Sequence, residues 1–191
     1  MRKVVIDDIV GLAAYEKVRQ DFCRRIIELK QKRRISLGDR VSLVFENRDT
    51  VIFQIQEMLR VERMNDLDKI RQEIAIYNQL IPDSRELSAT LFLEIEDQTH
   101  LREELVKFHG IEEAISLHVV THRLAGCFEA GRSKEDKISA VQYVRFRFDE
   151  PALEAFVSGA RSELVIDHQN YQAAVVLQPE TQGSLAEDLT T

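Results

Sequence analysis

Residues 86–96 read Glu-Leu-Ser-Ala-Thr-Leu-Phe-Leu-Glu-Ile-Glu, and this stretch decides the fold class. Its apolar residues alternate with polar ones, and Phe92 alone interrupts the alternation. A period of two places successive side chains on opposite faces of an extended chain. The pattern therefore predicts a β-strand, the most clearly defined strand of the sequence.

Further stretches on both sides add predicted strands, at residues 41–46, 115–122 with 124–128 as a continuation of the same run, 138–148, 164–166 and 173–177. Capped or amphipathic segments between them predict helices, at about residues 8–34, 47–64, 67–80, 97–109 and 149–159. Strands joined by short connections pair as antiparallel hairpins. We therefore expect an α+β fold, in which helices cover mainly one face of a largely antiparallel sheet of about five or six strands.

The length of 191 residues matches one domain. We expect a single α+β domain over residues 1–178. Residues 179–191 are polar, and we expect them to form a flexible C-terminal tail.

The charge and the hydropathy exclude several classes of partner. The chain has 26 Lys and Arg against 33 Asp and Glu, a net charge of −7, which disfavours binding to nucleic acid. No stretch approaches the roughly 18 apolar residues of a membrane span, and the N-terminus lacks the apolar core of a signal peptide. We therefore expect a cytoplasmic protein with neither nucleic acid nor membrane as its partner.

Familiar cofactor motifs are absent from the sequence. It contains neither a glycine-rich phosphate loop nor a pair of C-x-x-C motifs, and its two cysteines, Cys23 and Cys127, are far apart. Two cysteines cannot hold an iron–sulfur cluster. We therefore expect no intrinsic iron–sulfur cluster and no nucleotide-binding motif.

The predicted second helix carries the most unusual residue of the sequence. At 100° per residue its apolar stripe contains Val51, Ile55 and Met58, and Glu62 falls in the middle of that stripe, beside Ile55. A buried carboxylate is costly unless it is paired, protonated or bound to a metal ion. In the other interpretation the helix ends by Glu62 and its side chain reaches solvent, or it forms a structural pair with an arginine.

A second candidate position is the segment Asp167-His168-Gln169-Asn170-Tyr171, where a predicted strand ends. An aspartate that accepts from an imidazole can orient the ring for metal ligation or for proton transfer. In the other interpretation the segment is a turn in which Asp167 or Asn170 bonds to its own backbone.

Six motifs together resemble an uncharacterised bacterial family known as a domain of unknown function. They are FENR at 45–48, QIQEMLRVER at 54–63, YNQLIP at 77–82, ELSATL at 86–91, SAVQY at 139–143 and DHQNY at 167–171. The resemblance extends from about residue 6 to residue 177. Members of this family are often encoded beside a rubrerythrin-like protein and a heterodisulfide-reductase-like iron–sulfur protein, which implies a link to redox metabolism and redox proteins as partners.

These observations favour an accessory or binding protein that acts with redox partners. Its expected binding residues lie on the second helix, on neighbouring loops and on the later turn: Glu46, Asn47, Arg48, Gln56, Glu57, Arg60, Glu62, Arg63, Tyr77, Asn78, Asp167, His168 and Tyr171. Arginines on such a surface would bind a carboxylate or a phosphate. The alternative is an enzyme, dependent on a single metal ion, in which Glu57 or Glu62 meets Asp167 or His168. The sequence leaves homo-oligomerisation open.

Overall fold

The computed structural model describes residues 1–95, 99–128 and 139–190. Its helices are α1 (Leu12–Arg33), α2 (Arg48–Val61), α3 (Leu67–Tyr77), α4 (Leu101–Val106), α5 (Glu150–Val157) and α6 (Pro179–Thr190). Its strands are β1 (Arg34–Leu37), β2 (Val41–Glu46), β3 (Glu86–Leu93), β4 (Ile115–Val119), β5 (His122–Phe128), β6 (Val141–Arg147), β7 (Ser162–His168) and β8 (Tyr171–Val176). Three short 3₁₀ turns complete the described elements: η1 (Ile6–Asp8), η2 (Asn78–Leu80) and η3 (Ile111–Glu113).

The described strands form one antiparallel sheet in the order β1-β2-β3-β6-β5-β4-β7-β8. The mixed fold and the antiparallel pairing are confirmed, but the predicted number of five or six strands is wrong, because eight are described. Two strands were missed. β1 directly follows the first helix, and the predicted strand that begins at Ile115 is a hairpin, β4 and β5, which turns at Val120 with a positive φ of 53°.

The strand over residues 86–93 lies inside this sheet, as its alternating pattern predicts. Leu87, Ala89, Leu91 and Leu93 belong to the main apolar core, together with alternate residues of the other strands. The opposite face of β3 carries Ser88 and Thr90, which are also buried. Both faces of β3 are therefore covered, the inner one by the apolar core and the outer one by further elements of the chain.

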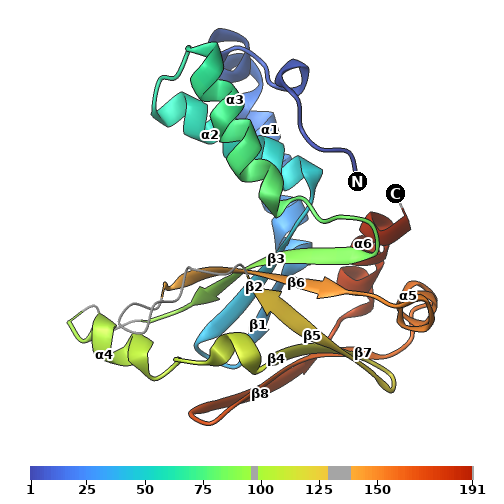
Figure 1. Ribbon diagram of the computed structural model, residues 1–191. Coiled ribbons are helices and arrows are strands. Elements are labelled where there is room, and N and C mark those ends of the chain that lie inside the picture. The colour runs from blue at the N-terminus through green and yellow to red at the C-terminus, as the bar shows by residue number, and fades with distance from the viewer. Residues whose placement is uncertain (96–98, 129–138, 191) are drawn as a thin grey trace.

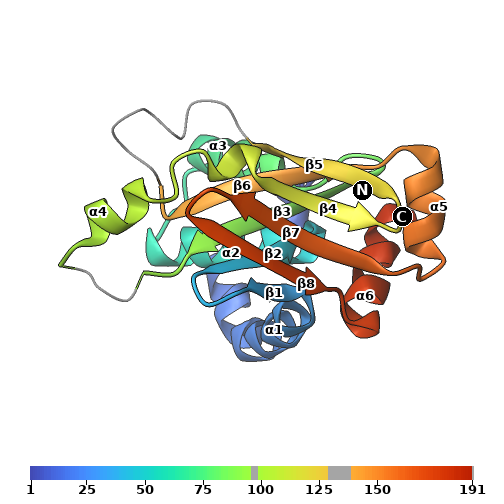
Figure 2. The same ribbon diagram turned by 90° about the horizontal axis from the view of Figure 1, so that it is seen from below.

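The sheet curls into a nearly closed barrel, with β1 and β8 as its two edges (Figure 2). A side chain joins these two edges. The hydroxyl of Tyr171 at the start of β8 donates to the carbonyl oxygen of Leu37 at the end of β1, and it accepts from the backbone N–H of Arg40 at 3.2 Å. The ring of Tyr171 packs against Phe108, with 5.4 Å between the ring centroids. Closure of the barrel therefore depends on Tyr171.

The helices do not lie mainly on one face of the sheet, and that expectation is wrong because the sheet closes on itself. Figure 1 shows α1, α2 and α3 together on one side of the barrel, α5 and α6 at one end and α4 at the other. We define the helical lobe as residues 1–33 and 47–81. It has its own apolar core, to which α2 contributes Val51, Ile55 and Leu59, and α3 contributes Ile74.

Residues 179–190 form helix α6, and the expectation of a flexible tail there is wrong. Leu185 is fully buried, and Gln182 donates to the carbonyl oxygens of Phe156 (2.9 Å) and Ala160 (2.8 Å). The sequence of this segment shows no clear apolar stripe, because its buried face includes polar residues such as Gln182. The partners of Gln182 lie more than 20 residues away in sequence.

Gly38 is predicted to be indispensable for closure. It has a φ of +70°, and a Cβ at this position would overlap the Tyr171 hydroxyl and lie 3.2 Å from Tyr171 Cζ. We expect Gly38→Ala to lower the free energy of unfolding, measured with urea, by at least about 1 kcal/mol more than Gly159→Ala, because the Tyr171 hydrogen bonds are lost as well. Gly159 is the matched control, since its φ is +83° and nothing lies within 4 Å of its Cβ position. Equal losses for the two variants would contradict this role.

Candidate functional site

Glu62 does not lie in an apolar seam. α2 ends at Val61, and Glu62 is the exposed residue that caps its C-terminus. Among the described residues its side chain makes no hydrogen bond or ion pair. The structure thus supports the interpretation in which the helix ends and the carboxylate reaches solvent, and Glu62 gives no basis for a buried anionic centre.

Glu57 is the carboxylate of α2 that is held by partners. Its Oε1 and Oε2 accept from Arg19 at 2.7 and 2.8 Å, and Oε1 also accepts from the Tyr15 hydroxyl at 2.8 Å. The Arg19 hydrogen bond, with the Tyr15 hydroxyl, lowers the pKa of Glu57, while burial and the Glu57 contact raise the pKa of Tyr15. Because Arg19 and Tyr15 belong to α1, this cluster joins α1 to α2.

Gln56, Asn78 and Arg48 hold the N-terminal segment of the chain on the helical lobe. Gln56 accepts from the N–H of Val10 (2.8 Å) and donates to its carbonyl oxygen (3.2 Å). Asn78 does the same for Val4, at 2.8 and 2.9 Å. Each amide thus satisfies a backbone donor and a backbone acceptor.

Arg48 completes this attachment, with its Nη2 2.6 Å from Asp8 Oδ1. The Val5 N–H, helped by Arg48 and Arg2, holds the pKa of Asp8 well below its usual range. The three predicted binding residues Arg48, Gln56 and Asn78 therefore bind a segment of their own chain.

Glu46 and Asn47 lie where the helical lobe meets the barrel. The Glu46 side chain is 3% exposed, and it accepts from Thr50 (2.5 Å), Gln54 (2.9 Å) and Thr90 (2.7 Å). Asn47 caps α2 by accepting from the N–H of Thr50 at 3.1 Å. Because these donors come from α2 and β3, the carboxylate of Glu46 ties the helix to the sheet.

The remaining predicted residues of the helical lobe are more exposed. Arg60 donates to Glu16 of α1 at 2.8 Å. Arg63 is exposed and has a positive φ of 49° in the turn after α2. Tyr77 packs half-buried against the core of the lobe, and burial raises the pKa of its hydroxyl.

Asp167, His168 and Tyr171 belong to a β-hairpin, so the turn of the second interpretation is present. The bonds to its own backbone are absent among the described residues: Asp167 accepts from the Gln172 side chain at 3.0 Å, and the Asn170 side chain donates to the carbonyl oxygen of Lys107 at 2.9 Å. In the β7–β8 register Asp167 pairs with Gln172 and His168 with Tyr171. His168, 5% exposed, donates from Nε2 to the carbonyl oxygen of His109 at 2.8 Å and accepts at Nδ1 from the Asn170 N–H at 3.3 Å. Both ring nitrogens are thus used by the backbone, in a neutral imidazole protonated on Nε2.

The two groups of residues named for a metal-dependent enzyme lie apart. Glu57 binds partners from α1, whereas His168 binds the backbone before η3, and Figures 1 and 2 place α2 and the β7–β8 hairpin on different sides of the barrel. Within residues 1–95, 99–128 and 139–190, no group of three His, Cys, Asp or Glu side chains is arranged to hold a metal ion. Among those same residues, no helix has both the length and the apolar character to cross a membrane.

One further cluster, around Arg33, could not be predicted from the sequence pattern. Arg33, the last residue of α1, is 1% exposed; it donates to Ser184 Oγ (3.1 Å) and to both carboxylate oxygens of Asp188. Burial raises the pKa of Asp188, while Arg33 and Asn47 act in the opposite direction. In sequence, Arg33 is hidden among the basic residues that end α1, and its partners lie about 150 residues away.

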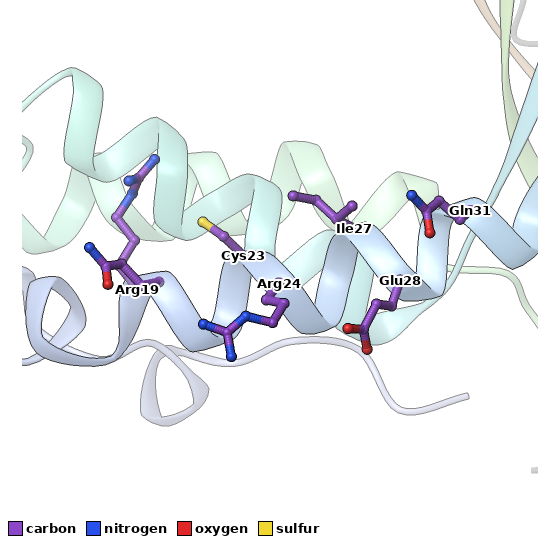
Figure 3. A pocket seen from close by; sticks show the side chains of 7 residues that line it. Arg19, Cys23, Arg24, Ile27, Glu28 and Gln31 are labelled. Atoms are coloured by element: carbon purple, nitrogen blue, oxygen red, sulfur yellow. The ribbon is translucent and has the colours of Figure 1, made fainter.

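Two hollows adjoin α1. One, of about 590 Å³, is formed by α1 alone, and Figure 3 shows Cys23, Arg24, Ile27 and Glu28 projecting from this helix around it. The other, of about 490 Å³, lies between the N-terminal segment, α1 and α2. None of the residues of the β7–β8 turn lines either hollow.

The fold and these contacts define an α+β protein in which a nearly closed antiparallel barrel carries a helical lobe. The chain belongs to the family described as "Protein of unknown function (DUF3501)", whose model matches residues 3–189. The resemblance to an uncharacterised family is thereby confirmed. A solved structure, a novel protein of unknown function from Burkholderia pseudomallei K96243, is 33% identical, with a TM-score of 0.93 over 98% of this chain and 100% of that one. A comparison with curated proteins finds no match.

The Glu57 cluster predicts an acid-dependent loss of stability. The pKa of Glu57 is lowered on folding, so its contribution is present above the ordinary value of 4.5 and is lost as the pH falls through the lower folded-state pKa. We expect Glu57→Gln to reduce the free energy of unfolding by roughly 1–2 kcal/mol at neutral pH, with a smaller deficit in acid. Chemical denaturation across pH measures both values. Glu62→Gln is the control and should change stability by less than about 0.5 kcal/mol; a deficit for Glu57→Gln that is independent of pH would contradict the assignment.

The amide of Asn78 is predicted to hold the N-terminal segment in place. Asn78→Ala leaves the N–H and the carbonyl of the buried Val4 without these partners, at a cost of about 1–3 kcal/mol. We expect faster hydrogen exchange of the Val4 amide in this variant, and unchanged exchange in Gln79→Ala, which removes an exposed neighbouring side chain. Unchanged protection of Val4 in Asn78→Ala would show that the segment is held by other contacts.

Proposed function

We propose that this protein is an accessory protein that binds a partner protein through its helical lobe. The observation that carries the proposal is where the exposed apolar side chains lie. Of the eleven large hydrophobic residues that are exposed in the described part of the chain, seven belong to the helical lobe: Val5, Val10, Val18, Ile27, Val61, Leu67 and Ile76.

Removal of apolar surface from water is favourable by about 25 cal/mol for each Å² that is buried. An exposed apolar side chain can therefore gain free energy when a partner covers it. Ile27 of α1 is 56% exposed and Val61, the last residue of α2, is 67% exposed. A concentration of such residues on one part of a protein is typical of an interaction surface. Because the predicted binding residues Arg48, Gln56, Glu57 and Asn78 are used by contacts within the chain, the exposed apolar residues support binding better than those four residues do.

The redox character of the partner is the finer part of the proposal. It rests on what the family resemblance implies, namely that rubrerythrin-like and heterodisulfide-reductase-like iron–sulfur proteins are encoded beside members of this family. An accessory protein beside such partners would bring them together or stabilise one of them, and the electron-carrying centre would belong to the partner.

Site-specific photo-crosslinking in the cell that encodes the protein tests this proposal. We expect a photoreactive side chain at Ile27 or Val61 to form a covalent complex with a partner, because both positions are exposed on the lobe. The matched controls are Val120 and Val176, exposed valines of the barrel, and they should not crosslink.

The outcomes separate the two parts of the proposal. Equal crosslinking from barrel and lobe, or no crosslink from the lobe, would overturn the proposed binding surface. If mass spectrometry identifies an iron–sulfur or rubrerythrin-like protein in the complex, the redox part is supported; a specific partner of another kind would overturn that part alone.

A further inference from the structure

The hollow between the N-terminal segment, α1 and α2 has an apolar floor and an open side. Val10, Val18, Phe22 and Ile52 supply its apolar surface. Its volume of about 490 Å³ is enough for one or two large side chains of another molecule. Unlike the hollow in Figure 3, which α1 forms alone, it is bounded by three segments.

The apolar stripe of α1 is only partly covered in this chain. The spacing of its apolar residues predicts one buried face, and Tyr15 and Ile26 are indeed buried. Val18, in the same stripe, is 51% exposed and lines the hollow, as does Val10, which is 45% exposed. An amphipathic helix is normally covered along the length of its stripe. The uncovered part at Val18 therefore marks where a second molecule would continue the core.

The charged residues around the hollow favour an acidic occupant. Asp8 is paired with Arg2 and Arg48, and Asp21 lies 3.6 Å from Arg24. The Arg25 guanidinium lies over the Phe22 ring, 4.9 Å from its centroid, and within the described part of the chain it makes no hydrogen bond or ion pair. Its N–H donors are therefore available to a carboxylate beside the apolar floor.

The backbone around the hollow favours a helical occupant. Among the residues that the structure describes, those lining the hollow belong to no strand, and the N–H and the carbonyl of Val10 are both bound by Gln56. An extended peptide would find no ladder of backbone groups to pair with here. A helix satisfies its own backbone hydrogen bonds and is recognised through its side chains.

We propose that this hollow docks an amphipathic helix of the partner, with a large apolar side chain against Val18 and Phe22 and an acidic side chain one helical turn away on Arg25. The proposal rests on the proposed function and names the kind of partner that the lobe binds. α1 itself carries seven Lys and Arg against three Asp and Glu, which disfavours pairing of α1 with α1 of a second copy.

Two matched peptide probes test the proposal. Each is a labelled helix of three heptads with Leu at positions a and d; one has Glu and the other Lys at positions e and g, so that neither pairs readily with itself. We expect the purified full-length protein to bind the Glu probe at least about tenfold more tightly than the Lys probe in fluorescence anisotropy. The preference should decrease as salt is added.

Variants assign any preference to the hollow. Arg25→Gln should abolish the preference for the Glu probe, Arg25→Lys should retain part of it, and Val18→Ser should weaken binding of the Glu probe. Arg24→Gln, in the neighbouring hollow of α1, is the control and should leave the preference unchanged. Thermal unfolding of each variant confirms that it is folded.

Absence of binding to both probes, equal affinity for both, or a preference that survives in Arg25→Gln would overturn the proposal. These results differ from failure of the proposed function, because the crosslinked complex of the lobe would persist and would be insensitive to Arg25→Gln.

Discussion

The buried ion pair between Arg33 and Asp188 fixes the direction in which α1 leaves the barrel. α1 ends at Arg33 and β1 begins at Arg34, so no loop separates the helix from the first strand. A guanidinium buried at this junction needs a countercharge, since an unpaired buried charge costs several kcal/mol. Asp188 and Ser184 of α6 supply the partners, and the last helix of the chain therefore holds the first one in place.

The helical lobe then assembles on α1 through polar contacts with distinct roles. Glu57 joins α2 to α1 through Arg19 and Tyr15, and Glu46 joins the start of α2 to β3. Gln56 and Asn78 attach the N-terminal segment. Several apolar side chains and the Arg25 guanidinium take no part in these contacts and remain on the surface of the lobe. The proposed binding surface consists of these groups.

The elements with a strong local pattern could be predicted from the sequence. The alternation around Leu91 and the capped start of α2 at Asn47 depend on residues that are close in sequence, so their periodicity is visible. The number of strands was not visible, because β1 has four residues and a turn at Val120 divides what reads as one strand. α6 was missed because its polar residues are buried against distant partners.

Prediction of the candidate site from the sequence was limited in the same way, because the partners of its residues are distant in sequence. The sequence singled out residues that have defined partners, such as Gln56 and Asn78, but it could not show that those partners are backbone groups of the same chain. It placed Glu62 in an apolar stripe because helical periodicity was extended past Val61, where α2 ends. The spacing of Val18 and Phe22 places them in the apolar stripe of α1, and only the arrangement of α1 and α2 shows that part of this stripe is uncovered.

Hydrogen exchange of the protein in its native complex shows whether the helical lobe is the binding surface. Exchange would be compared between the complex and the isolated chain, peptide by peptide. We predict added protection in α1 and in the N-terminal segment, with barrel strands such as β4 and β5 unchanged. Protection confined to the barrel, with α1 exchanging as it does in the isolated chain, would show that the partner binds elsewhere than on the lobe.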